Sequence, residues 1–521
     1  MILLIHPPAT KPCEPPAGIT QLAGALGSHG IPYGLLDANL EGMLYQLEAP
    51  VDAFDTWTRR AKKNASSHLN SLRNLSFYGR FDRYKRAVLD LNRLLEKSAT
   101  DKDLRISLAD YEDRSLSPTR TDDLLSAAEH PEKNPFYPYF SQRLPDVIEK
   151  GQYGYIGVSL SFLSQALSGF AMIGFVKRRF PALKIIIGGG LVTSWMKRAT
   201  FRNSFGGLID YMVSGPGEEA LLNILGKTGH GRARSRPAYG FLHSQKYLAP
   251  GFIMPYSSSS GCYWGKCAFC PEKAEGNRYE QLPARVVTPE LIGLVEALRP
   301  ALIHLTDNAV SPAVLRGFAE NPPGAPWYGF ARVTDCLTDP DFCVALKRSG
   351  CVMLKLGVES GNQDVLDAMH KGNDVSTTSR ALRALSNAGI ATYVYLLFGT
   401  PWESEDKARR TLDFTVKHSA CIDFLNVAIF NLPRLSPESF DLVQTDFYEG
   451  DLSLYTNFVH PHGWTRRNVR SFVEREFRQH SAIKPIVLRQ PPLFTSNHAP
   501  FFCRAMNPLL SEPVRIDGEF A

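Results

Sequence analysis

The sequence lacks the features of membrane and secreted proteins. In its 521 residues no apolar run approaches the roughly 20 residues that a membrane-spanning helix needs. The apolar run from Ile2 to Ile5 has no basic leader and fits a buried strand better than a secretory signal. Nine cysteines are few, and their number is odd, which argues against a disulfide scaffold. We therefore expect a cytoplasmic protein with no membrane span.

The chain also lacks a strong charge of either sign. Its 58 basic and 52 acidic side chains leave a net charge of only +6, too dilute to indicate a nucleic-acid partner. With 44% hydrophobic and 21% charged residues it is neither disordered nor fibrous. Its length exceeds what one hydrophobic core usually supports, so two or three domains are expected.

The first part of the chain predicts a doubly wound α/β domain. Short apolar strands alternate with segments of helical periodicity, and glycine- and serine-rich turns follow several of the strands. A polar, largely helical stretch at about 46–145 is too long for a loop and predicts an insertion. We expect a Rossmann-like domain over 1–228 with its ligand at the carboxyl ends of the strands, and a linker over 229–250.

A second alternating series begins after the linker. Its six predicted strands, each followed by a helical segment, indicate an open partial barrel over 251–432, and the mixed region 433–521 breaks the pattern. Thr288 followed by Pro289 predicts the start of one helix. The strands lie near Met254, Ile303, Trp327, Met353, Tyr393 and Phe424.

Three cysteines in one loop are the sharpest chemical signal. Cys262, Cys267 and Cys270 fall within nine residues of a glycine-containing segment, so their thiols can converge on a soft metal centre. Structural zinc needs a fourth ligand, and the next cysteine, Cys336, is 66 residues away. The spacing favours an iron–sulfur cluster over zinc.

The run from Gly261 to Cys270 resembles the signature loop of the radical S-adenosylmethionine (SAM) superfamily, with an aromatic residue just before the last cysteine. The spacing departs from the commonest Cys-x3-Cys-x2-Cys pattern, because four residues separate Cys262 from Cys267. The resemblance implies a partial (βα)6 barrel and a [4Fe-4S] cluster held by the three thiolates. It also implies that SAM binds to the open iron and is cleaved reductively to a 5′-deoxyadenosyl radical.

The same resemblance implies further SAM-binding residues. The run from Leu356 to Gly361 is similar to the family's fourth barrel strand, where Glu359 is expected to bind the ribose or the methionyl amine. The run from Phe398 to Glu403 is similar to the loop near the adenine. Positional expectations are weaker for the other candidates. Asp307 and Asn308 end the second strand. Arg332 ends the third and is expected either to pair with the methionyl carboxylate or to form a surface salt bridge. Phe269 is expected to pack on the adenine or on the barrel.

The first domain resembles the cobalamin-binding domain of cobalamin-dependent radical SAM enzymes. The implied corrin contacts are small residues that let the backbone approach the corrin, and hydroxyls that hydrogen-bond its tail. The sequence has no Asp-x-His-x-x-Gly motif for an axial histidine, and no Gly-x-Gly-x-x-Gly fingerprint follows the first strand. The expected contacts are Ser159, Ser161, Ser164, Gly188, Gly189, Gly190, Gly215, Gly217 and Glu218.

These resemblances imply a cobalamin-dependent methyltransferase that acts on an unactivated carbon. The alternatives are a radical epimerase, cyclase or rearrangement enzyme without methyl transfer, and a zinc-stabilised binding module. An electron donor such as flavodoxin or ferredoxin is implied as a partner. The substrate is not defined by the sequence, since a peptide, a lipid or a small metabolite fits an open barrel mouth.

Overall fold

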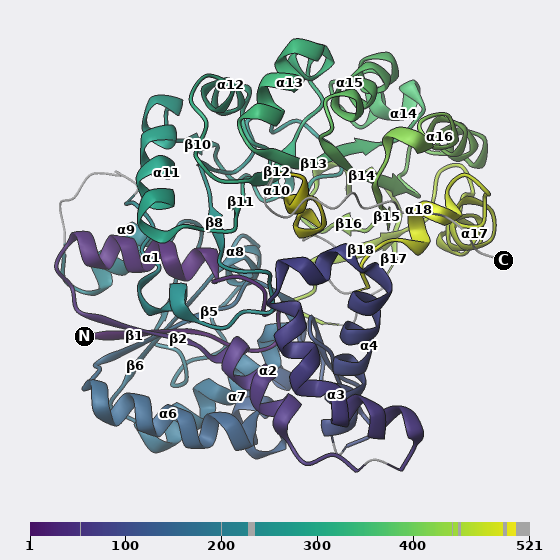
Figure 1. The fold of residues 1–521 in the computed structure, drawn as a ribbon. Coiled ribbons are helices and arrows are strands. Elements are labelled where there is room, and N and C mark those ends of the chain that lie inside the picture. Colours follow the sequence, from purple (N-terminus) through teal and green to yellow (C-terminus); the bar gives the residue numbers. More distant parts are fainter. Residues whose placement is uncertain are drawn as a thin grey trace.

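The protein was analysed as a computed structural model. It describes residues 1–52, 54–99, 101–198, 201–227, 235–439, 441–445, 450–492 and 498–506. Residues 229–234 of the predicted linker lie outside these ranges. Two parallel sheets dominate the described chain, one in each half (Figure 1). The α/β architecture expected from the sequence is confirmed.

The first sheet has the strand order β2-β1-β5-β6-β7, with all pairs parallel. Its strands are buried on both faces, as short Ile-, Leu- and Val-rich runs require. Helices α1 and α9 cover one face, and α7 with the insertion covers the other. The elements are β1 (Ile2–His6), α1 (Ala17–Ser28), β2 (Tyr33–Asp37), β5 (Tyr155–Ser159), α7 (Leu163–Arg179), β6 (Lys184–Gly188), α8 (Gly190–Met196), β7 (Tyr211–Met212) and α9 (Glu218–Ile224).

The insertion between β2 and β5 is mainly helical, as its sequence predicts. Its helices pack against the first sheet, and they share one buried core with residues of the barrel strands (Figure 1). Its elements are α2 (Ala38–Glu48), α3 (Thr56–Leu72), η1 (Leu75–Gly79), α4 (Phe81–Ser98), β3 (Leu104–Ile106), β4 (Tyr111–Asp113), α5 (Thr121–Glu129), η2 (Pro131–Lys133) and α6 (Tyr137–Gly151).

The second sheet has the order β15-β14-β13-β12-β11-β8, again with parallel pairs. Helices α11 to α16 form an arc outside it (Figure 1), which is the open (βα)6 barrel expected from the sequence. The elements are β8 (Ile253–Tyr256), α11 (Ala284–Leu298), β11 (Leu302–Leu305), α12 (Pro312–Glu320), β12 (Trp327–Ala331), α13 (Pro340–Arg348), β13 (Cys351–Glu359), α14 (Gln363–Ala368), α15 (Val375–Asn387), β14 (Ala391–Phe398), α16 (Glu405–Lys417) and β15 (Phe424–Ile429).

One helix start differs from its prediction. Helix α11 begins at Ala284, a turn before the expected start at Thr288, and Pro289 lies inside it. Thr288 is buried in this helix and does not cap it. Pro283, in extended backbone, precedes the helix instead. The Thr-Pro pair was therefore wrong as a start signal, because a second proline just upstream marks the boundary.

The C-terminal region closes one side of the barrel. Its elements are short and irregular: β16 (Leu432–Pro433), β17 (Gln444–Thr445), β18 (Tyr455–Phe458), α17 (Arg466–Phe472), α18 (Lys484–Leu488) and η8 (Ala499–Met506). Helix η8 crosses in front of the barrel strands in Figure 1, and Ala499 and Cys503 belong to the same buried core as β1 and the insertion. Among the described residues, no helix is long and apolar enough to cross a membrane.

Candidate functional site

The three cysteines lie in the loop that leaves the first barrel strand. Gly261 precedes them with a φ of +69°, and a Cβ there would lie 2.4 Å from the Arg278 carbonyl oxygen, so only glycine fits this turn. The Ala268 amide donates to the Met369 carbonyl (2.9 Å), which fixes the loop on the segment after α14. The loop therefore presents its thiols at the carboxyl ends of the barrel strands.

The donor set fits an iron–sulfur cluster. Cys267 is buried, Cys262 and Cys270 are half-buried, and all three are free thiols. The charge of Cys262 acts on Cys267, and that of Cys267 acts on Cys270, so neighbouring members of the set lie within electrostatic range. Among the described side chains, no three His, Cys, Asp or Glu form a group that could hold a single metal ion.

Two cations face the buried thiol. Burial raises the pKa of Cys267, while the charges of Lys371 and Arg332 act in the opposite direction. Arg332 Nη1 lies 3.8 Å from the Cys267 sulfur, and its guanidinium stacks 4.3 Å over the Trp264 ring. Burial also raises the pKa of Cys270 to about 11. Because metal binding requires the thiolate, these cations favour the form that a cluster needs.

Glu359 ends β13 and is paired with a buried lysine. Its Oε1 lies 2.8 Å from Lys371 Nζ, and both side chains are largely shielded from water. A Cβ at Gly357 would come within 2.5 Å of this oxygen and 2.8 Å of the ammonium, so the ion pair occupies the space over that glycine. The sequence analysis gave Lys371 no role, because twelve residues separate it from Glu359 and only the fold brings the two side chains together.

Asp307 and Asn308 are placed differently from each other. Asp307 is buried and accepts hydrogen bonds from the Ser258 amide (3.0 Å), the Ser258 hydroxyl (2.7 Å) and the Ser259 hydroxyl (2.6 Å). Its carboxylate thus anchors the backbone that leads into the cysteine loop. Asn308 is exposed. The structure brings Asp307 to the site as a support of the loop.

Phe269 lies on the barrel side of the loop. Its ring packs against the buried cluster of Val365, Leu366 and Met369, and Lys371 Nζ lies 5.5 Å from the ring centroid.

The loop after β14 contains a group that the sequence analysis did not single out. Glu403 is fully buried, and its carboxylate accepts a hydrogen bond from the Gly399 amide (2.6 Å). Burial raises the pKa of Glu403 to about 8.

The serine candidates of the first domain lie around its carboxyl edge. Ser159 ends β5 half-buried, and Ser161 is exposed. The Ser164 hydroxyl donates to the Ala9 carbonyl (2.8 Å), so it holds the loop that follows β1.

The glycine candidates line the same edge. Gly188 ends β6, Gly189 caps α8, and Gly190 is the first residue of α8. The space beside Gly215 is open, with no atom within 4 Å of a Cβ built there. Gly217 caps α9, and Glu218 is its first residue. The edge is therefore small, polar and accessible.

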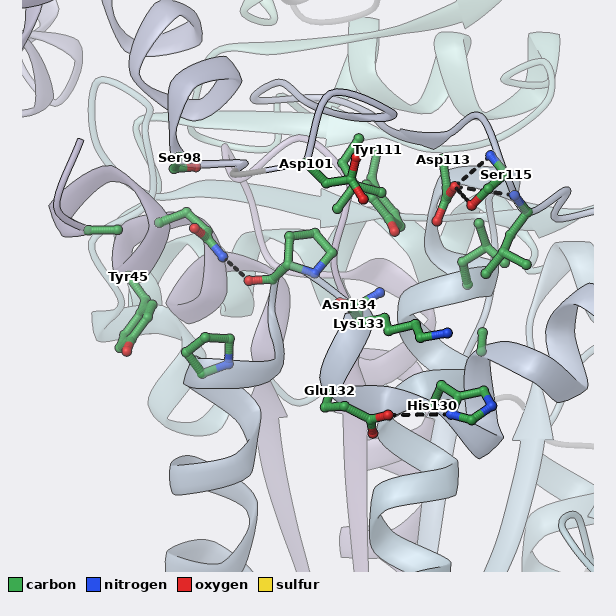
Figure 2. Close-up of a pocket in the computed structure, with 18 of the residues that line it drawn as sticks. Tyr45, Ser98, Asp101, Tyr111, Asp113, Ser115, His130, Glu132, Lys133 and Asn134 are labelled. Atoms are coloured by element: carbon green, nitrogen blue, oxygen red, sulfur yellow. Dashed lines mark hydrogen bonds and ion pairs between the residues drawn. The ribbon is translucent and has the colours of Figure 1, made fainter. Parts of the chain in front are cut away.

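A separate cavity lies within the insertion. It has a volume of about 540 Å³ and is lined by residues of α2, the β3–β4 hairpin and the segment from α5 to α6. Figure 2 shows its polar side chains, including Asp101, Asp113 and the pair His130–Glu132, whose Nδ1 and Oε1 atoms lie 3.4 Å apart. None of the predicted site residues lines it. The three cysteines and Glu359 therefore lie outside this cavity.

Comparisons with known proteins agree with the site. Residues 256–415 match the model of the radical SAM superfamily. The anaerobic magnesium-protoporphyrin IX monomethyl ester cyclase of Rubrivivax gelatinosus is 24% identical over 258 residues, 40% of this chain and 44% of that protein. The bacteriochlorophyllide d C-12(1)-methyltransferase of Chlorobaculum tepidum is 26% identical over 186 residues, 34% of this chain and 39% of that protein. The chain thus spans less than half the length of these curated relatives.

The fold comparison covers more of the chain. The radical SAM methyltransferase TsrM from Kitasatospora setae, solved with cobalamin and a [4Fe-4S] cluster bound, superposes with a TM-score of 0.50 at 16% identity. The match covers 85% of this chain and 77% of that one, and so includes both sheets. A radical SAM domain implies SAM and a [4Fe-4S] cluster as cofactors, and with them a need for a reductant. Residues 256–415 thus form a radical S-adenosylmethionine domain, and the chain as a whole is similar in fold to this cobalamin-bound structure.

Proposed function

We propose that this protein is a cobalamin-dependent radical SAM methyltransferase that transfers a methyl group to an unactivated carbon. The observation that carries the proposal is the contact between the two carboxyl edges. The Ser194 hydroxyl of α8, just after the glycine turn, donates to Glu275 Oε1 (2.5 Å), just after the cysteine loop. A corrin at the first edge would therefore lie next to the site of radical formation, and proximity of this kind accelerates reaction between two bound groups.

In this proposal the barrel residues hold the cluster and SAM. Cys262, Cys267 and Cys270 supply the thiolates, and Glu359 accepts hydrogen bonds from SAM. When bound, these groups supply the one-electron chemistry that yields the 5′-deoxyadenosyl radical. Lys371 fixes the orientation of Glu359 through their 2.8 Å ion pair. Asp307 keeps the loop in place through Ser258 and Ser259.

The residues of the first domain are proposed to hold the corrin and its tail. Gly188, Gly190 and Gly215 leave the carboxyl edge open, which a flat macrocycle requires. The exposed hydroxyl of Ser161 is free to hydrogen-bond a polar tail, and Ser159 lies beside it. The relative solved with cobalamin bound has the same fold over most of both chains, which supports this assignment.

Anaerobic reconstitution tests the proposal. The full chain is loaded with iron, sulfide and hydroxocobalamin, passed through gel filtration, and supplied with SAM and a chemical reductant. We expect retained corrin and, with candidate substrates, 5′-deoxyadenosine, S-adenosylhomocysteine and a mass gain of one methyl group by mass spectrometry. Free elution of the corrin from a protein that still cleaves SAM would contradict methyl transfer.

A radical cyclase without methyl transfer is the second candidate. It is favoured by the similarity to the cyclase of Rubrivivax gelatinosus, which spans 40% of this chain. Formation of 5′-deoxyadenosine with product of altered structure, but with no S-adenosylhomocysteine, distinguishes this candidate from the first.

The physiological reductant is proposed to be a flavodoxin or a ferredoxin, because the domain consumes single electrons. All nine cysteines are free thiols, which suits a reducing compartment such as the cytoplasm.

A further inference from the structure

The lumen of the barrel contains a second polar site, separate from the cysteine loop. Along β13, Lys355 and Gly357 share the inward face, because strand residues alternate between faces. The register shifts between Gly357 and Glu359, and the Glu359 carboxylate lies over Gly357 on this same face. The intervening Leu354, Leu356 and Val358 are fully buried under the outer helices. Lys355 thus lies on the inner wall, four residues before Glu359 and about 13 Å deeper at the usual rise of a strand.

Lys355 is the end of a chain of hydrogen bonds. Its Nζ lies 3.2 Å from His304 Nε2, and His304 Nδ1 lies 2.8 Å from Glu14 Oε1. Glu14 belongs to the loop after β1, so the first domain contributes to the barrel lumen. A carboxylate on Nδ1 favours the tautomer with its proton there, which leaves Nε2 to accept from the ammonium. A cation and an anion are thereby held on opposite nitrogens of one imidazole.

Aromatic rings surround this chain. His304 stacks on Tyr328 with ring centroids 4.4 Å apart, and Lys355 Nζ lies 5.4 and 5.5 Å from the rings of Tyr328 and Phe330. Phe330 and Tyr395, whose centroids are 4.7 Å apart, remain partly exposed although they lie on central strands covered outside by helices. Their exposed surface therefore faces the lumen, which is open at this level.

Two buried polar atoms at this site have no hydrogen-bond partner among the described residues: Glu14 Oε2 and His498 Nδ1. His498 stacks on Tyr393 (4.6 Å), and the charges of Lys11 and Lys355 act on it. A buried polar atom left unpaired costs free energy, so its presence points to a group that completes it. Burial also lowers the pKa of Lys355 to about 8; the charge of Glu14 opposes this shift and the charge of Lys11 adds to it.

We propose that this site binds the polar end of the substrate, and that the substrate is an aromatic small molecule with an amino group and a carboxylate. The carboxylate pairs with Lys355, the ammonium with Glu14 Oε2, and the ring packs on Phe330 and Tyr395. The inference rests on the proposed function, because it takes the lumen beneath Glu359 as the substrate site. It favours a small metabolite over a peptide chain or a lipid.

Binding of three matched probes tests the inference in the absence of SAM. L-Phenylalanine carries both charges, 3-phenylpropionate only the carboxylate, and phenethylamine only the ammonium. Isothermal titration of the full chain should show phenylalanine binding at least tenfold more tightly than either truncated probe. Equal affinity for the three probes, or no binding by any of them at millimolar concentration, would overturn the proposal.

Variants locate the site. Lys355→Met should weaken phenylalanine and 3-phenylpropionate at least tenfold and leave phenethylamine unchanged, and Glu14→Gln should weaken phenylalanine and phenethylamine instead. Lys150→Met, on an exposed helix face, is the matched control and should change no affinity. If Lys355→Met does not fold, Glu14→Gln still tests the proposal. Loss of a merely structural contact between the domains would weaken the binding of all three probes equally, whereas loss of a ligand contact weakens only the two probes that carry an ammonium.

The two proposals fail separately. Selective probe binding by a chain that retains no corrin and methylates nothing leaves the substrate class standing and removes the methyltransferase assignment. If the chain binds none of the probes selectively but methylates a substrate that lacks an amino group and a carboxylate, the methyltransferase assignment stands and the substrate class is wrong.

Discussion

The two parallel sheets of this protein present carboxyl edges of different chemistry. The edge of the first sheet consists of glycines and serines with few charges, whereas the edge of the barrel carries three thiols, Glu359 and the cations Arg332 and Lys371. Close approach of a large neutral surface needs small residues, and binding of a charged cofactor needs fixed charges. Two parallel sheets of different strand order therefore carry two kinds of binding edge, and each edge can be disrupted without the other.

The largest effect is expected at the barrel edge. Replacement of Cys262, Cys267 and Cys270 together by alanine should abolish cluster assembly and formation of 5′-deoxyadenosine, because no other thiolate supply is present in the loop. Iron and sulfide analysis with mass spectrometry measures both. A stoichiometric cluster with intact SAM cleavage in this variant would falsify the assignment.

A bulky side chain at the carboxyl edge of the first sheet should prevent corrin binding and leave the cluster at the barrel edge unchanged. Gly190→Val places a branched side chain at the exposed turn, where a Cβ would lie 3.7 Å from the Ser161 carbonyl oxygen. We expect loss of hydroxocobalamin retention in gel filtration with unchanged cluster content. Gly206→Val, at an open position with no atom within 4 Å, is the matched control. Retained corrin in Gly190→Val argues against this edge as the corrin site.

A smaller effect is expected from Glu359→Gln. Removal of a charge-assisted hydrogen bond should weaken SAM binding by about 1 to 3 kcal/mol, which is roughly 5- to 150-fold in affinity, while the cluster absorbance stays the same. Equilibrium binding of SAM to the reconstituted chain measures this. Lys371→Met reports the contribution of the ion pair alone, and an unchanged affinity in a folded Glu359→Gln variant speaks against SAM contact.

The pH dependence of stability is expected to change at Glu403. Because the pKa of Glu403 is raised by burial to about 8, its folded form binds a proton that the unfolded chain releases near pH 4.5. Its stabilising contribution is complete below about pH 4.5 and is lost as the pH rises through 8. Glu403→Gln should therefore flatten the decline of the melting temperature between pH 5 and 8. A decline as steep as in the unchanged chain contradicts the raised pKa.

The sequence predicted the elements of both sheets and the cysteine loop, because these depend on local periodicity and spacing. It could not predict which polar side chains form hydrogen bonds within the protein. Asp307 and Ser164, both proposed from position as ligand contacts, form hydrogen bonds within the protein, and these depend on neighbours distant in sequence. Lys371 and the Glu14–His304 pair were missed for the same reason, since Glu14 and His304 are separated by 290 residues.

The shared core has a consequence for folding. One buried cluster joins Leu3 and Ile5 of β1 with Tyr328, Met353 and Tyr393 of the barrel and with Ala499 and Cys503 of η8. Within this cluster Tyr78 packs on Phe501, with ring centroids 5.2 Å apart, so residues more than four hundred positions apart are in contact. During synthesis, part of the apolar surface of this cluster stays exposed to solvent until Ala499 and Cys503 of η8 have been synthesised. We expect slow maturation and a requirement for chaperones during synthesis.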